Sequence, residues 1–266
     1  MENKLKNNQN KLNKIIFSKF VKQNFDFSIY EIKLKYIHTF KVAHIAVKLA
    51  KKLGLKEDLA FIIGLLHDYA RFLQFTKFKT FKDIESFDHG EMACKLLFNE
   101  NAIENFVIDK DFYPVIYVAI YLHNKKYVDE DFVKTYLEKY PTSLSFKETL
   151  NYIHLIRDAD KIDILRVITE KDYHLKTPLN GISPTLKDEA INLKTPTSKE
   201  SKTKLDTIVV FMSFLYCLHF KESQKFINLN KYLKIVKAKY LKILTPEDQE
   251  FFLNHLERIK NFLNNQ

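Results

Sequence analysis

The sequence predicts an all-α protein, and three of its features carry that prediction. The chain has 266 residues, of which 46% are apolar and 14% aromatic, enough to bury a sizeable hydrophobic core. It contains only four glycines and six prolines, too few for the many tight turns of a sandwich or barrel. Its apolar residues recur at the three- and four-residue spacing of amphipathic helices. We therefore expect a helical bundle with additional C-terminal helices.

Four segments are expected along the chain. Residues 1–30 begin with an Asn- and Lys-rich stretch and are expected to be a partly disordered N-terminal extension. Residues 31–175 are expected to form the helical core. Residues 176–202 contain three prolines and Gly181, which favours a long loop or a lid. Residues 203–266 are expected to form helices that pack on the core.

The first helices of the core are placed by apolar spacing and by residues typical of helix ends. The spacing predicts a helix that begins at His38, and Gly54 follows it where a left-handed C-terminal cap is expected. A second helix, apolar on more than one face and therefore central in the bundle, is expected over residues 57–72. It would carry His67 and Asp68 in its second half.

Three later helices each begin with a characteristic signal. Asp88 can cap the first of them, which places His89 in the first helical turn. Pro114 can open the second, whose apolar run ends at His123. The third is expected over residues 145–167, with a capping box at its start.

Charge and composition argue against nucleic-acid and membrane partners. The formal net charge is +10, but the lysines are spread among 33 acidic residues, and arginine, the usual bidentate phosphate ligand, is rare. Cys94 and Cys217 form no Cys-x-x-Cys pair. The N-terminus lacks the apolar core of a signal peptide, and the apolar stretch 208–220 is too short to span a bilayer. We expect a cytoplasmic protein.

Six polar side chains lie within or beside the apolar helices, where burial without a partner would be costly. A hydrogen-bonded His-Asp pair is the ordinary explanation for one such site. Six sites favour metal binding, because imidazole nitrogens and carboxylate oxygens are usual ligands of divalent ions and converging helices can supply them. Two ions could share the set, with Asp68 or a water as a bridge. The candidate ligands are His38, His67, Asp68, His89, His123 and Asp160.

The order and context of these residues resemble the HD-domain superfamily of metal-dependent phosphohydrolases. The resemblance covers a histidine before an apolar helix, then LLHDYAR with the His-Asp pair that names the family, then RDADKID. The motifs DHG and HN supply His89 and His123, which match the extra histidines of members with binuclear sites. Two features differ from the family pattern: Tyr-Ala replaces Ile-Gly after the pair, and the GYP part of the HD-GYP signature is missing.

The resemblance implies hydrolysis of a phosphate ester or anhydride by metal-activated water. The expected cofactors are two divalent ions, from among Mn, Fe, Ni, Mg and Zn, and the expected substrate is a nucleotide or another small phosphorylated metabolite. Asp68 is expected to act in catalysis as the bridging ligand, and Arg71, three residues later, to contact the substrate phosphate. Asp163 is a candidate to orient a ligand histidine.

Other functions fit the same pattern. A phosphodiesterase acting on cyclic dinucleotides or single-stranded nucleic acid would use the same metals, and an open basic groove beside them would favour it. A non-catalytic regulatory HD protein could keep the fold, although all six ligand positions are intact. Oxygen-dependent chemistry at an iron pair is a more distant alternative. The sequence leaves open the substrate, the native metal, the number of ions, and whether the chain forms a homo-oligomer.

Overall fold

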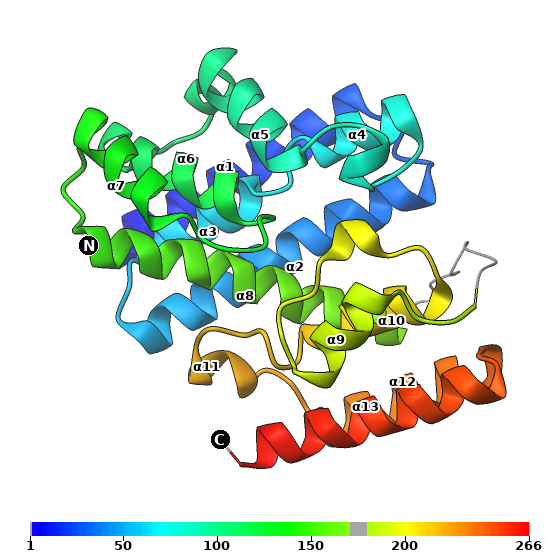
Figure 1. Cartoon of the computed structure of the whole chain (residues 1–266). Helices are drawn as coiled ribbons and strands as arrows, with labels where there is room; N and C mark the ends of the chain where they lie inside the picture. Colours follow the sequence, from blue (N-terminus) through cyan, green and yellow to red (C-terminus); the bar gives the residue numbers. More distant parts are fainter. Residues whose placement is uncertain (1, 171–179, 266) are drawn as a thin grey trace. The chain divides into compact units, whose positions relative to one another are not determined.

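The computed structural model describes residues 2–170 and 180–265, and throughout these residues every regular element is helical (Figure 1). The predicted all-α class is therefore confirmed. The chain divides into two compact units, Met1–Asp160 and Lys161–Gln266. The α-helices that begin in the first unit are α1 (Glu2–Asn24), α2 (Tyr30–Leu53), α3 (Glu57–Leu66), α4 (Arg71–Phe78), α5 (His89–Cys94), α6 (Tyr113–Leu122), α7 (Glu130–Lys139) and α8 (Phe146–Glu170).

Helix α3 is the central helix of the first unit and packs against α1, α2 and α6. All its residues from Leu59 to Leu66 are buried, as its all-round apolar sequence predicts. Its tightest contact is with α2, where a Cβ atom added to Gly64 would lie 2.6 Å from the Cα atom of Ala43. A glycine at this position therefore allows the two backbones to approach closely.

Helix α2 ends as predicted, with Gly54 at a φ of 69° and its N–H donating to the carbonyl of Ala50. Its start lies at Tyr30, earlier than predicted, so that His38 falls in its middle. Helix α1 spans most of the predicted N-terminal extension and buries Phe17 and Val21. The predicted disorder of the first residues of this extension stays a prediction.

The helix predicted over residues 57–72 is interrupted, because α3 ends at Leu66 and α4 begins at Arg71. The ring of His67 donates to the carbonyl of Gly64, which the backbone of residue 68 would use in a continuous helix. The next hydrogen bonds span only three residues, from the Tyr69 N–H to Leu66 and from the Arg71 N–H to Asp68. The His-Asp pair therefore lies in a turn, with its side chains set by the turn geometry.

The remaining predicted helix ends of this unit agree with the structure. Asp88 caps α5 by accepting from the N–H groups of Gly90 and Glu91, and a proline opens α6. A capping box between Ser145 and Glu148 precedes α8. Helices α5 and α6 approach so closely that a Cβ atom on Gly90 would lie 2.9 Å from the carbonyl oxygen of Ile120.

The second unit has its own hydrophobic core, which includes the buried residues Ile208, Met212 and Phe252. Asp206 organises one edge of this unit, because its carboxylate accepts hydrogen bonds from the backbone and hydroxyl of Ser183. Its α-helices, besides the end of α8, are α9 (Pro184–Ile191), α10 (Lys204–Ser213), α11 (Lys221–Gln224), α12 (Leu229–Tyr240) and α13 (Pro246–Asn264).

The segment predicted as a loop or lid, residues 176–202, lies partly outside the described residues. From residue 180 on it contains α9 and the short 3-10 helix Ser198–Glu200. A lid function for this segment stays a prediction, as do the predicted segment boundaries. Among the described residues, no helix combines the length and the apolarity that crossing a membrane requires.

Candidate metal centre

The six predicted ligands come together in the first unit, although they come from five separate segments of the chain. They form two groups, and within each group one ligand atom from every residue lies within 4.8 Å of the others. All but Asp160 are buried, and the side chain of Asp160 is 20% exposed. The first group contains His38, His67 and Asp160, and the second contains Asp68, His89 and His123.

The first group is built where α2, the turn after α3, and α8 meet. The Nε2 atom of His38 lies 3.0 Å from Oδ1 of Asp160, and Nε2 of His67 lies 3.8 Å from the same oxygen. Two imidazole nitrogens therefore face one carboxylate oxygen, and these three atoms would supply three of the four ligands of a tetrahedral metal shell or half of an octahedral one.

Asp68 lies between the two groups and presents one oxygen to each. Its Oδ2 atom is 3.2 Å from Nε2 of His67 and 3.5 Å from Nε2 of His38. Its Oδ1 atom is 3.6 Å from Nε2 of His89 and 3.9 Å from Nε2 of His123. This is the arrangement that a carboxylate bridging two ions would need.

The tautomers of three histidines follow from their hydrogen bonds. Carbonyl oxygens can only accept, so Nδ1 of His67 donates to Gly64 at 2.8 Å, and Nδ1 of His123 donates to Ile120 at 2.6 Å. Nδ1 of His89 likewise donates to the carboxylate of Asp83 at 2.7 Å. In the neutral form, each ring then has a lone pair on Nε2, directed at the centre of the site.

These lone pairs provide a test of whether the residues fit a metal ion. Nε2 of His89 and Nε2 of His123 lie only 2.9 Å apart. Burial lowers the pKa of His123 to about 3, and the neighbouring His89 adds to this effect, so the ring is neutral at pH 7. Burial and the nearby Arg71 also lower the pKa of His89. Two facing lone pairs repel each other unless a cation lies between them, so the residues fit a divalent ion.

The carboxylates of the centre are ionised, as metal ligands must be. Burial raises the pKa of Asp68, but Lys35 and His67 outweigh burial and hold it well below its ordinary value. Burial also raises the pKa of Asp160, and the rings of His38 and His67 again outweigh it. For His67 itself, burial opposes protonation, while the two neighbouring carboxylates raise the pKa.

Asp83 is a functional candidate that the sequence did not reveal. Its carboxylate orients His89 through Nδ1 and also accepts from Arg71 at 2.9 Å, Gln74 at 3.0 Å and Asn124 at 3.2 Å. Burial opposes its ionisation, but His89, Arg71 and Gln74 together outweigh burial and hold the pKa of Asp83 well below its ordinary value. A carboxylate in this role fixes both tautomer and ring orientation of a ligand histidine.

The orienting role predicted for Asp163 stays a prediction. Its buried carboxylate binds Arg166, with N to O distances of 2.6 and 2.9 Å. Asp83, which contacts His89, lies at the start of a short 3-10 helix, Asp83–Glu85, in the connection between α4 and α5. No helical period runs through this segment, so sequence spacing gave no signal for it.

Two basic residues lie beside the oxygens of Asp68. Lys35 donates to Oδ2 over 2.6 Å, and Nε of Arg71 lies 3.4 Å from Oδ1. Lys35 was not singled out from the sequence, although its position three residues before His38 on one helix was a usable signal. A third basic residue, Lys125, binds Asp88 at 2.7 Å and is thereby held at the start of α5.

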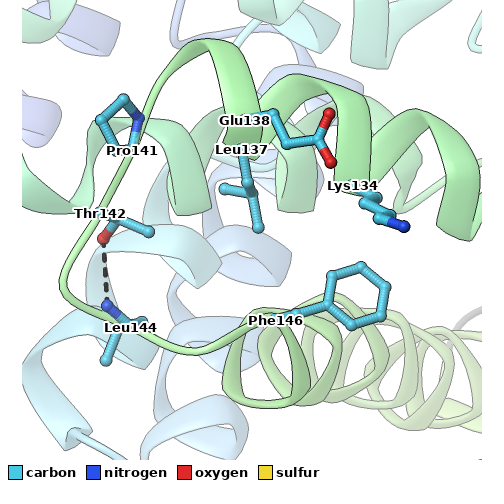
Figure 2. Close-up of a pocket in the computed structure, with 7 residues that line it drawn as sticks. All are labelled: Lys134, Leu137, Glu138, Pro141, Thr142, Leu144 and Phe146. Carbon is cyan, nitrogen blue, oxygen red and sulfur yellow. Dashed lines mark hydrogen bonds between the residues drawn. The ribbon is translucent and has the colours of Figure 1, made fainter.

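A surface cavity of about 510 Å³ lies elsewhere in the first unit, between α7 and the start of α8 (Figure 2). It contains none of the six predicted ligands. Apolar side chains such as Leu137 and Phe146 line it together with Lys134 and Glu138, which point from α7 (Figure 2). We assign no part of the metal chemistry to this cavity.

Comparison with known proteins identifies one domain of the chain. Residues 36–165 match the family model of the HD domain, a span that encloses all six predicted ligands. Residues 36–165 are therefore an HD domain, an all-α fold of a superfamily of metal-dependent hydrolases that binds divalent metals. Neither a search of curated proteins nor a search of solved structures gave a match.

Proposed function

We propose that this HD domain is a phosphohydrolase that acts on a phosphate ester or anhydride of a nucleotide or another small phosphorylated metabolite. The observation that carries the proposal is the paired arrangement around Asp68. Each of its two oxygens faces one pair of histidine Nε2 atoms, over distances of 3.2 to 3.9 Å. Such symmetry is expected of a binuclear hydrolytic site, in which two ions hold both the nucleophile and the phosphoryl group.

The proposed ligand sets follow from which atoms face each other. His38, His67, Asp160 and Oδ2 of Asp68 would hold one divalent ion. His89, His123 and Oδ1 of Asp68 would hold the second, which keeps more positions open for water or substrate. Nitrogen and carboxylate donors of this kind suit Mn, Fe, Ni or Zn, and Mg to a smaller extent.

The reaction would be the displacement of an alcohol or phosphate leaving group by water. The ions, when bound, would lower the pKa of the attacking water and neutralise charge on the phosphoryl oxygens. The water oxygen forms a bond to phosphorus, the bond from phosphorus to the leaving oxygen breaks, and that oxygen takes up a proton. The chain contributes fixed ring orientations through Gly64, Ile120 and Asp83, and two ionised carboxylates.

The complete ligand set favours catalysis over a purely regulatory role. A regulator that only keeps the fold has no need for His89 and His123 with their Nε2 atoms 2.9 Å apart, since burying two facing lone pairs is costly. A phosphodiesterase would use the same residues, so the choice between monoester and diester substrates requires an activity measurement.

The first test is metal content, by elemental analysis of protein purified without chelators and without a metal-affinity column. We expect about two ions per chain from two ligand groups, and hydrolysis of p-nitrophenyl phosphate or of a nucleotide panel that depends on them. Asp68→Asn should lose metal and activity while keeping its helical content. Asp131→Asn, which removes the same charge at an exposed position of α7, is the matched control. Full metal content and activity in Asp68→Asn would contradict the proposal.

A further inference from the structure

We propose that Lys35 binds the phosphoryl group of the substrate, and that its ammonium group rests on Asp68 until a metal ion takes that oxygen. This inference rests on the proposed function and adds a residue to it. It assigns to Lys35 the phosphate contact that the sequence had suggested for Arg71.

The position of Lys35 is the first observation. It lies on α2, one turn before His38, so both side chains project from the same side of the helix. Its Nζ atom is 2.6 Å from Oδ2 of Asp68. The same oxygen faces the Nε2 atoms of His38 and His67, at 3.5 and 3.2 Å. The ammonium group therefore occupies the side of Asp68 at which the first ion is expected.

Competition between the two cations follows from this geometry. A metal ion held by the two histidines and Oδ2 of Asp68 would bind the same oxygen that now accepts the hydrogen bond from Lys35. At such short range two positive charges repel each other, so the ammonium group has to leave Oδ2 when the ion binds. Metal affinity at this position is therefore reduced by the cost of releasing Lys35.

The surroundings of Lys35 indicate where its ammonium group would go. The lysine side chain is 16% exposed, whereas that of Asp68 is 3% exposed, so the head group lies at the outer side of the centre. The ring of Phe81 lies 5.4 Å from Nζ and can hold a cation beside the site. A phosphoryl group bound next to the ion would offer the displaced ammonium group a new anionic partner.

Arg71 is less suited to that role, because Nη1 of its guanidinium is already engaged and its Nε lies 3.4 Å from Oδ1 of Asp68. Its Nη1 atom donates to Gln74, to the carbonyl of Phe81 and to Asp83. These contacts tie Arg71 to the network that orients His89, and a substrate phosphate would have to compete with them. Arg71 is therefore a positioning residue, and Lys35 is the cation that metal binding releases.

The test compares Lys35→Met and Lys35→Arg with Lys41→Met, which removes the same charge at an exposed position of α2. Mn²⁺ is titrated into the metal-free proteins, and inorganic phosphate is then titrated into the loaded proteins, both by calorimetry. Lys35→Met should bind Mn²⁺ more tightly than the wild-type protein does, and phosphate about tenfold more weakly, as loss of one charged hydrogen bond implies. Lys35→Arg should keep much of the phosphate affinity, and Lys41→Met should behave as wild type.

Three results would overturn the inference. Unchanged phosphate affinity in Lys35→Met would show that the ammonium group does not contact the phosphoryl group. Weaker binding of both Mn²⁺ and phosphate, together with lost helical content, in both Lys35 variants would indicate a purely structural ion pair. If the loaded wild-type protein binds no phosphate at all, the proposed function fails as well. Phosphate binding that is normal in wild type and unaffected by Lys35→Met leaves the proposed function intact.

Discussion

The close approach of α2 and α3 makes Gly64→Ala a sharp test of how the fold positions the metal ligands. Gly64 lies three residues before His67, and the helix it touches carries His38. A Cβ atom at residue 64 would lie 2.6 Å from the Cα atom of Ala43, and ordinary contacts begin at 3.4 Å. The two backbones must therefore separate by about 0.8 Å, because neither atom belongs to a flexible side chain.

This displacement gives two magnitudes. Overpacking of a core costs about 1–3 kcal/mol, and alanine in place of glycine within a helix offsets about 1 kcal/mol of that cost. We therefore expect Gly64→Ala to lower the free energy of unfolding by up to about 2 kcal/mol. A metal site tolerates deviations of only about 0.2 Å in its bond lengths, so separating His38 from His67 should weaken Mn²⁺ binding by at least about tenfold, comparable with loss of a supporting contact.

Unfolding in urea and calorimetric titration with Mn²⁺ measure the two effects. Gly54→Ala is the matched control, because it strains a left-handed residue at a φ of 69° but meets no atom within 4 Å. It should lose about 1 kcal/mol of stability and keep its metal affinity. If Gly64→Ala binds Mn²⁺ as tightly as the wild-type protein does, the contact between α2 and α3 does not set the ligand positions, and the reasoning is wrong.

Three further predictions concern single side chains. Asp83→Asn should weaken metal binding about 10- to 100-fold by releasing the ring of His89, and an unchanged Mn²⁺ titration would contradict this role. Burial lowers the pKa of His255 from 6.5 to about 4, so the folded protein takes up this proton less readily than the unfolded chain. The resulting stability is complete above pH 6.5 and is lost as the pH falls to 4, by up to about 3 kcal/mol. His255→Phe should therefore flatten the pH dependence of urea unfolding in this window, and an unaltered slope would refute the assignment. Asp206→Asn should destabilise the second unit by about 2 kcal/mol through its contacts with Ser183, and equal urea midpoints would show that these contacts are not stabilising.

Local sequence patterns predicted the helices because helix formation depends on near neighbours along the chain. Gly54, Asp88 and the Ser145 capping box marked helix ends that the structure confirms. The pattern failed where a side chain competed with the backbone. The apolar helical spacing of residues 57–72 continues through His67. In the structure the ring of His67 is hydrogen-bonded to the carbonyl of Gly64, and the helix breaks there.

The sequence by itself determined the chemistry of the centre: six imidazole and carboxylate groups within or beside apolar helices, in an order that resembles the HD family. Only the tertiary structure decided how their atoms face one another, with the two oxygens of Asp68 directed at separate histidine pairs. It alone placed Asp83 on His89 and Lys35 on Asp68. The physical reason is that these contacts depend on the packing of helices and on irregular backbone between them, which no periodicity along the chain encodes.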